Sequence, residues 1–198
     1  ETKLANIVRL GARYIKVPFD EFEETFITRN HKDVDGVLVH PFSDPTVMAG
    51  NGTIGLEILE DLPDVNTVIT AYAGGGLSCG IGSAIRAVKP KVKLYAAEVD
   101  TGAPFAASMA MGKPVVVEHT PTFVDGISGT MVLDEMWPLA SGLMDGALVS
   151  SLKNVAEATK LMAERNRTVA EGAGAASLAA ALSGQIGNGK VVCVISGG

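Results

Sequence analysis

The stretch AYAGGGLSCGIGSAI, residues 71–85, places three consecutive glycines between an apolar run and a sequence typical of a helix. An ordinary turn seldom needs three glycines in a row. Without Cβ atoms, the N–H groups of Gly74, Gly75 and Gly76 can converge on an anion, and the positive end of the following helix adds to that field. The stretch therefore predicts a phosphate-binding loop at a strand-to-helix junction.

Apolar strands and helices alternate on both sides of this loop. Because such strands are apolar throughout, they predict a mostly parallel sheet covered by helices on both faces, a three-layer α/β fold. In such a sheet ligands lie beyond the carboxyl ends of the strands, which is where the triple glycine falls. The expected strands are residues 13–17, 36–40, 65–71, 92–98, 146–150 and 191–196, and one expected helix spans residues 130–143.

Composition excludes several classes of protein. Hydrophobic residues make up 47% of the 198 residues and charged ones 19%, which indicates a globular protein with a large core. The net charge is −6 and no stretch concentrates Lys and Arg, so no nucleic-acid partner is expected. Gly, Pro or charged residues interrupt the apolar runs, so no membrane span is expected. Two cysteines, Cys79 and Cys193, suit a reducing compartment and predict a cytoplasmic protein.

The glycine loop, taken alone, leaves several interpretations open. It lacks the Lys-Ser/Thr ending of a nucleoside-triphosphate loop. A dinucleotide fingerprint would need glycine at position 79, where Cys79 stands, although Glu98 supplies an acidic residue at a suitable distance. A glycine-rich turn that only allows close packing of strand and helix is the structural alternative.

A wider set of motifs in one order resembles a known family. The set comprises His40-Pro41-Phe42-Ser43-Asp44-Pro45, Ala49-Gly50-Asn51-Gly52-Thr53 with Glu57, Gly74-Gly75-Gly76-Leu77, Glu171-Gly172-Ala173-Gly174-Ala175-Ala176 and Ser196-Gly197-Gly198. Together they are similar to the threonine/serine dehydratases of the fold-type II pyridoxal phosphate (PLP) enzymes, a group that includes serine racemase. The likeness runs from Thr2 to Gly198 and implies an incomplete fold-type II architecture with a remnant of the smaller domain.

The resemblance implies a role for each matched residue. Gly74, Gly75, Gly76 and Leu77 would hold the phosphate of the PLP cofactor through backbone N–H groups. Ser196, followed by Gly197, would face the pyridine nitrogen. A hydroxyl cannot keep that nitrogen protonated as a carboxylate would, and a neutral ring favours β-elimination. In the family, serine or threonine loses water and yields a 2-oxo acid and ammonia.

Three positions depart from the family pattern, and one of them is Asn51, where Gln is usual. Ala73 stands where the first of four glycines is usual, which would cause strain only if the position requires a positive φ. In racemase-like relatives an acidic residue six positions after the equivalent of Glu98 completes a metal site. Here that position is Pro104, so we expect no metal there and a structural hydrogen bond for Glu98.

The lysine that forms the Schiff base in the family has no counterpart in a matching Lys-x-Arg-Gly-Ala context. We therefore expect no catalytic lysine in this chain and regard it as the C-terminal portion of the catalytic unit. Residues 1–45 would be a remnant of the small domain and residues 46–198 part of the large PLP-binding domain. Exposed faces would then favour a homo-oligomer or pairing with a complementary N-terminal piece.

Three further positions have both a functional and a structural interpretation. His40 could be catalytic or could join a core hydrogen bond, and Asp125-Gly126 could approach the cofactor or form a simple turn. Glu171 could lie near the substrate or favour the dipole of the following helix. The alternative function is a non-catalytic module that binds phosphate or a small molecule. The sequence separates neither serine from threonine nor elimination from racemisation.

Overall fold

The computed structural model describes residues 2–127 and 129–197. The chain divides into two compact units, Glu1–His40 and Pro41–Gly198, whereas the sequence predicted a boundary slightly later, after residue 45. The first unit contains the helices α1 (Thr2–Arg9) and α2 (Phe19–Thr28). The second contains α3 (Pro45–Asp61), β1 (Thr67–Ala71), α4 (Gly76–Val88), β2 (Lys93–Val99), α5 (Pro104–Met111), η1 (Asp125–Ile127), α6 (Trp137–Leu143), β3 (Gly146–Ser150), α7 (Leu152–Leu161), the π-helical turn η2 (Met162–Asn166), α8 (Gly172–Leu182) and β4 (Val191–Cys193).

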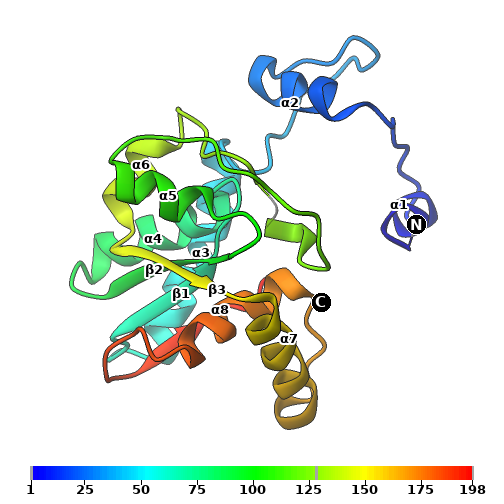
Figure 1. The fold of residues 1–198 in the computed structure, drawn as a ribbon. Helices are drawn as coiled ribbons and strands as arrows, with labels where there is room; N and C mark the ends of the chain where they lie inside the picture. Colours follow the sequence, from blue (N-terminus) through cyan, green and yellow to red (C-terminus); the bar gives the residue numbers. More distant parts are fainter. Residues whose placement is uncertain (1, 128, 198) are drawn as a thin grey trace. The chain divides into compact units, whose positions relative to one another are not determined.

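The four strands of the second unit form one parallel sheet in the order β3-β2-β1-β4 (Figure 1). In the register, Thr67 of β1 lies between Lys93 of β2 and Val191 of β4. The glycine turn follows β1 at its carboxyl end, and the residues after β4 leave the sheet at that same edge. The predicted parallel α/β fold is thus confirmed.

The alternation of side chains along each strand produces two separate cores, one on each face of the sheet. Val68 and Leu94 point to one face, where α3, α4, α5 and α6 bury residues such as Leu59, Ile81 and Phe105. On the opposite face, α7 and α8 pack on the sheet through alanines that permit close approach, namely Ala158, Ala175 and Ala176. The strands contribute Ile69, Ala97 and Leu148 to the same core. The sheet is therefore the middle of three layers.

The predicted strands at residues 13–17 and 36–40 are wrong, because neither range forms a strand. Both lie in the first unit, whose described residues provide no neighbouring strand to complete a hydrogen-bond ladder. Many apolar side chains of this unit are exposed, among them Val8, Leu10, Ile15, Ile27, Val37 and Val39. An apolar or alternating sequence does not form a strand unless a neighbouring strand accepts and donates its backbone hydrogen bonds.

The helix predicted at residues 130–143 is half as long as expected, since α6 begins only at Trp137. Pro138 lies in the first turn of α6, where a missing N–H costs nothing. The preceding residues run irregularly, and Val117 N–H donates to the Thr130 carbonyl.

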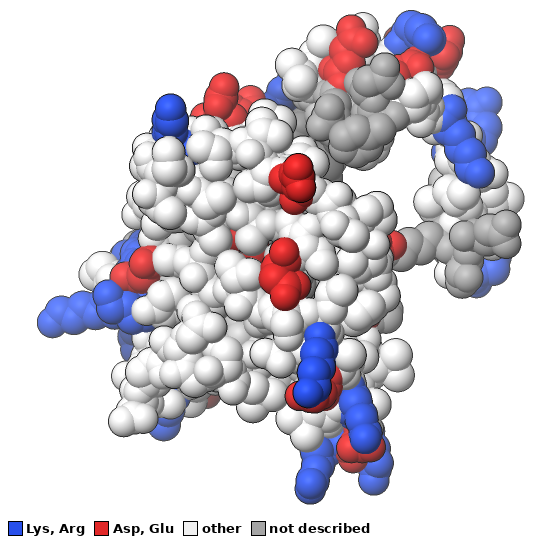
Figure 2. Space-filling model, viewed as in Figure 1, with Lys and Arg blue, Asp and Glu red and all other residues white. Residues whose placement is uncertain are grey.

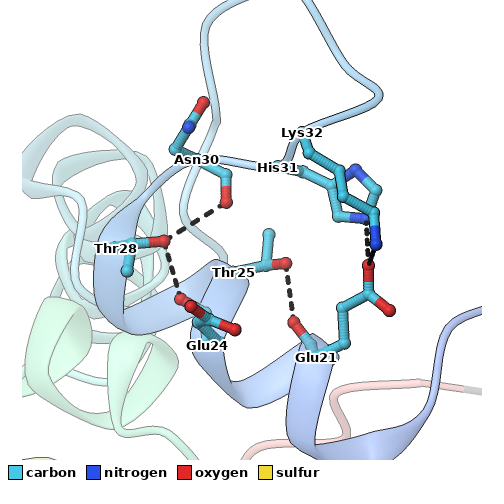
Figure 3. Close-up of a pocket in the computed structure, with 7 residues that line it drawn as sticks. All are labelled: Glu21, Glu24, Thr25, Thr28, Asn30, His31 and Lys32. Atoms are coloured by element: carbon cyan, nitrogen blue, oxygen red, sulfur yellow. Dashed lines mark hydrogen bonds and ion pairs between the residues drawn. The ribbon is translucent and has the colours of Figure 1, made fainter.

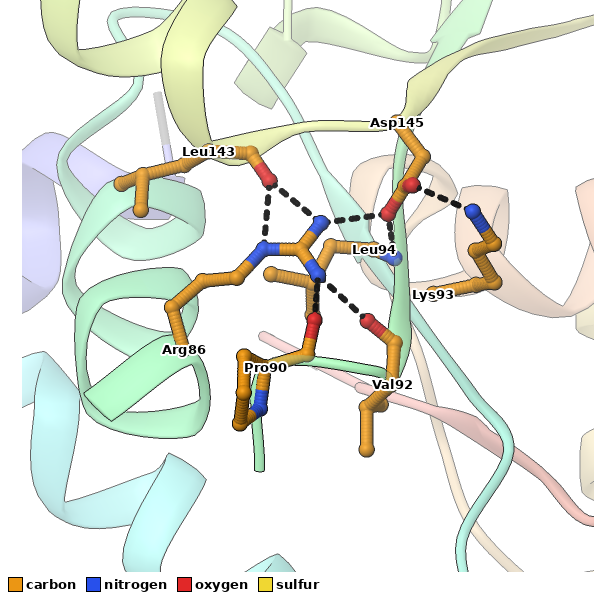
Figure 4. A network of polar contacts seen from close by, with 7 residues as sticks. All are labelled: Arg86, Pro90, Val92, Lys93, Leu94, Leu143 and Asp145. Carbon is orange, nitrogen blue, oxygen red and sulfur yellow. Dashed lines mark hydrogen bonds and ion pairs between the residues drawn. The ribbon is translucent and has the colours of Figure 1, made fainter. Parts of the chain in front are cut away.

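A polar cluster connects α4 and α6 to the edge of the sheet where β2 and β3 begin, opposite the glycine turn (Figure 4). The Arg86 guanidinium donates to the Leu143, Pro90 and Val92 carbonyls and to the Asp145 carboxylate. Asp145 also accepts from Lys93 Nζ at 2.8 Å and from the Leu94 N–H at 2.9 Å. These contacts lower the pKa of Asp145, against the effect of its partial burial.

Charged side chains are sparse on the face of the second unit seen in Figure 2. The Lys and Arg side chains drawn there lie at the margins of that unit and do not gather in one patch. Among the described residues, no helix is both long enough and apolar enough to cross a membrane.

Candidate functional site

The turn between β1 and α4 requires glycine for steric reasons at each of its three glycines. Gly75 has a φ of +91°, and a Cβ there would lie 2.9 Å from Tyr72 Oη. A Cβ on Gly74 would meet the Phe42 ring, and one on Gly76 would lie 2.5 Å from Phe42 Cα. The backbone of this turn is therefore as bare as the sequence predicted, and Phe42 packs directly on it.

Ala73, the departure from the family pattern, is not strained. Among the described residues, the non-glycine residues with positive φ are Arg29 and Arg167. Behind the turn, Thr70 Oγ1 donates to Ser78 Oγ at 2.7 Å, and Ser78 Oγ donates to the Ala71 carbonyl at 3.0 Å. These buried hydroxyls tie the end of β1 to the first turn of α4 and hold the glycines in place.

The N-terminus of α4 faces the turn without a side-chain cap. Gly75 is the N-cap residue, and α4 has no side-chain cap hydrogen bond among the residues that the structure describes. Helix N-termini leave such N–H groups for an outside acceptor and carry a partial positive charge. The first turn of α4 thus offers donors to an anion.

Ser196 follows β4 and lies outside the sheet ladder. Val194 still donates to the Ile69 carbonyl, at 3.0 Å, but the residues after it have no strand partner among the described residues. Instead α8 holds this segment, because Ser177 Oγ donates to the Val194 carbonyl at 2.7 Å and the Glu171 N–H donates to the Gly197 carbonyl at 3.1 Å.

The glycine turn and Ser196 line the same cavity, which has a volume of about 190 Å³. Of the residues that the resemblance assigned to the cofactor, Gly74, Gly75, Gly76, Leu77 and Ser196 line it. Gly197 is not in the wall; it packs against α8, where a Cβ on Gly174 would lie 2.3 Å from its carbonyl oxygen. The other lining residues are Pro41, Phe42, Ala71, Ala73, Gly126, Ile127, Glu171 and Ala173.

Phe42 and Ile127 are wall residues to which the sequence analysis assigned no role. Phe42 belongs to the motif at residues 40–45. Because this motif and the glycine motif resemble the same family, the sequence could have indicated that Phe42 lies near the cavity. Ile127 had no signal of its own beyond the neighbouring Asp125-Gly126. Of that pair, Gly126 lines the cavity.

Glu98 lies outside the cavity and has a structural role, as expected. Its side chain is 2% exposed, and its two carboxylate oxygens accept from the Phe105 N–H at 2.8 Å and the Ala106 N–H at 2.7 Å. Glu98 thereby caps the start of α5. Burial raises the pKa of Glu98 to about 7, although the two N–H groups act in the opposite direction.

His40, in the first unit, is buried and has an aromatic neighbour. Its ring lies edge-on to Phe26, with the centroids 5.1 Å apart. This contact packs the His40 ring in the interior of the first unit, while the core hydrogen bond of His40 stays a prediction.

The first unit contains a larger hollow of about 530 Å³ between α2 and the turn that follows it (Figure 3). Its polar groups contact one another: Glu21 Oε1 lies 2.8 Å from Lys32 Nζ and 3.4 Å from His31 Nε2. Thr25 and Thr28 donate to carbonyls one turn earlier in the helix. No residue predicted as a site residue lines this hollow.

None of the described residues that line the cavity of the glycine turn is a lysine. Among the lysine side chains that the structure describes, Lys89 is half-buried and the others are exposed. A lysine that reacts as an amine needs burial or a cationic neighbour to lower its pKa. The described lysines lack such burial.

Sequence and structure comparisons give the class of protein. Residues 1–197 match the family described as pyridoxal-phosphate dependent enzymes, and the chain belongs to this family. The fold is the fold-type II architecture of threonine dehydratases and serine racemases.

Particular relatives come from both groups. The chain is 38% identical over 200 residues to an L-threonine ammonia-lyase of Thermotoga maritima, a match that covers all of this chain and 50% of that protein. It is 32% identical to a serine racemase of Oryza sativa, over 99% of this chain and 60% of the relative. The structure of maize serine racemase superposes with a TM-score of 0.91 at 30% identity, over all of this chain and 64% of that one. The chain thus spans about half the length of the curated relatives it matches.

Proposed function

We propose that this chain forms the cofactor-phosphate and ring-nitrogen side of a PLP-dependent ammonia-lyase that acts on serine or threonine. The observation that carries the proposal is the shared cavity of Gly74–Leu77 and Ser196, at the carboxyl edge of a parallel sheet. The products would be a 2-oxo acid and ammonia. When bound, PLP would supply the electron-accepting ring for the elimination.

The glycine turn allows a phosphate ester to approach its backbone closely because it carries no Cβ atoms, whose positions are taken by Phe42 and Tyr72. Gly74 and Gly76 are already packed against Phe42, and the N–H groups at the start of α4 have no side-chain cap. These donors and the helix dipole would bind the phosphate without a lysine or arginine. Among the described residues, Glu171 is the one charged residue in the cavity wall, so none of the described lining residues is a cation that competes with the turn for the phosphate.

Ser196 fits the neutral pyridine nitrogen. A hydroxyl donates one hydrogen bond, which an unprotonated ring nitrogen can accept. It carries no negative charge, so it would not favour a protonated ring as a carboxylate does. A serine in place of a carboxylate at this position agrees with β-elimination. Racemisation is the alternative reaction, because some relatives are serine racemases.

The assignment of the two units to the small and large domains of the family remains a proposal. So do the cytoplasmic location and the association with a second copy or a complementary piece. The exposed apolar side chains of the first unit support association, since such surfaces are commonly covered in protein assemblies.

Binding of pyridoxine 5′-phosphate tests the site, because this compound has the ring and phosphate of PLP but no aldehyde. Ala73 lines the cavity beside the turn and has no positive φ, so both Asp and Asn can replace it. We expect Ala73→Asp to bind at least about tenfold more weakly than Ala73→Asn, because only the carboxylate repels the phosphate. Isothermal titration calorimetry measures both, with circular dichroism as the check on folding. Equal affinities of the two variants would contradict a phosphate at this turn.

A non-catalytic binding module is the second candidate, and the exposure of the described lysines favours it for this chain taken by itself. Borohydride reduction in the presence of pyridoxal 5′-phosphate, followed by peptide mapping, distinguishes the two. Specific trapping of one lysine at equimolar cofactor would favour a self-sufficient enzyme. Diffuse labelling of surface lysines, together with retained phosphate affinity, would favour the module.

A further inference from the structure

Ser196 stands on a segment that the sheet does not hold. The strand β4 ends at Cys193, and the last ladder contact of this segment is the Val194 N–H to the Ile69 carbonyl. The hydroxyl of Ser196 has no hydrogen-bond partner among the described residues, and the residue is exposed. The direction of its Oγ therefore depends on what fixes the neighbouring Gly197.

Glu171 lies between this segment and the opposite wall of the cavity. Its backbone N–H donates to the Gly197 carbonyl, and its Oε1 would lie 2.8 Å from a Cβ on Gly197. The same oxygen would lie 3.2 Å from a Cβ on Gly126, in the turn η1. The Glu171 carboxylate thus packs against two glycines from distant parts of the chain. Glu171 and Gly126 line the cavity, whereas Gly197 does not.

We infer that Glu171 is a positioning residue that fixes the Ser196 segment against η1 and so directs the Ser196 hydroxyl at the ring nitrogen of the bound cofactor. This inference rests on the proposed function of the cavity. Glu171 acts through the Gly197 backbone and through side-chain packing. It does not need to touch the reacting atoms.

The placement of this carboxylate is physically favourable. Glu171 is the N-cap residue of α8, with an extended ψ of 168°, and its side chain makes no cap hydrogen bond to the first turn. Its negative charge is nonetheless stabilised by the positive end of the eleven-residue helix. Since α8 is buried along most of its length, it provides a rigid base from which the side chain reaches the segment after β4.

The absorption spectrum of bound pyridoxine 5′-phosphate tests this role, because the spectrum of its hydroxypyridine ring changes when the nitrogen is protonated. Titration of the complex with pH gives the pKa of the bound ring. We expect Glu171→Ala to shift that pKa in the same direction as Ser196→Ala, by about 0.5 pH unit or more. Glu171→Gln keeps the shape of the side chain and is expected to stay near the wild type.

Gly197→Ala provides a second variant that keeps the glutamate. Its new Cβ would displace the Glu171 carboxylate, so it should shift the ring pKa as Glu171→Ala does. Glu157→Ala is the matched control, since Glu157 is exposed on α7 and its ion pair with Lys153 spans 3.8 Å. An equal shift in Glu171→Gln and Glu171→Ala would overturn the positioning role in favour of a direct effect of charge.

The outcomes separate this inference from the proposed function. If the wild-type chain fails to bind pyridoxine 5′-phosphate, the proposed function fails. If it binds and Ala73→Asp abolishes binding, while Glu171→Ala leaves the ring pKa unchanged, the site stands and the role of Glu171 is refuted.

Discussion

The conformation of Gly75 makes a quantitative prediction about the stability of the glycine turn. Gly75→Ala places a Cβ at a φ of +91°, 2.9 Å from Tyr72 Oη and 3.3 Å from Met136 Cε. Gly112 is the matched control, because it also has a positive φ, +69°, but no atom lies within 4 Å of its Cβ position. Gly112→Ala therefore measures backbone strain alone.

The magnitude follows from two contributions. Strain in the left-handed region costs about 1–2 kcal/mol for a residue with a Cβ. Overpacking against a buried side chain adds about 1–3 kcal/mol. We expect Gly112→Ala to lose about 1–2 kcal/mol of unfolding free energy and Gly75→Ala about 2–5 kcal/mol. Tyr72→Phe removes the nearest atom, so the double variant Gly75→Ala/Tyr72→Phe should recover about 1 kcal/mol relative to additivity.

Urea unfolding of the four variants and the wild type, followed by circular dichroism, measures these differences. Tyr72→Phe by itself should be neutral or slightly stabilising, because its buried hydroxyl has no partner among the described residues. The reasoning is refuted if Gly75→Ala costs no more than Gly112→Ala, or if the Gly75 and Tyr72 substitutions are strictly additive.

Two further predictions concern groups outside the cavity. Glu98 has a folded-state pKa of about 7, above its ordinary value of 4.5. Its contribution to stability is therefore complete below about pH 4.5 and is lost as the pH rises through 7, a change of about 3 kcal/mol at 1.36 kcal/mol per pKa unit. Urea midpoints between pH 5 and pH 8 should fall in the wild type and much less in Glu98→Gln; parallel slopes would exclude Glu98 as the cause. Arg86→Met should lose about 3 kcal/mol in thermal or urea unfolding, because it leaves three carbonyls without their side-chain donor and removes one of the three groups that donate to Asp145. Arg86→Lys should recover only part of that loss, since one ammonium cannot serve the same set of acceptors, and full recovery would show that charge alone matters.

The parallel sheet and the glycine turn could be predicted from local sequence. Mostly apolar strands such as Thr67–Ala71 are typical of a sheet covered on both faces, and three glycines before a helix are unusual enough to indicate an anion site. The ordered motifs added Ser196 by resemblance to a family. Local reasoning failed at residues 13–17 and 36–40, because a strand depends on a partner that no local pattern supplies.

Local sequence determined where the chain turns. The positive φ of Gly75, which is the N-cap residue of α4, needs only a glycine at that position. The tertiary structure alone decided that Phe42 packs on the glycines and that the Glu171 carboxylate lies between Gly126 and Gly197. These groups are far apart along the chain. These groups meet because the parallel strands all end at the same edge of the sheet. The helix α8 packs on the face opposite α4, and its first residues reach that edge.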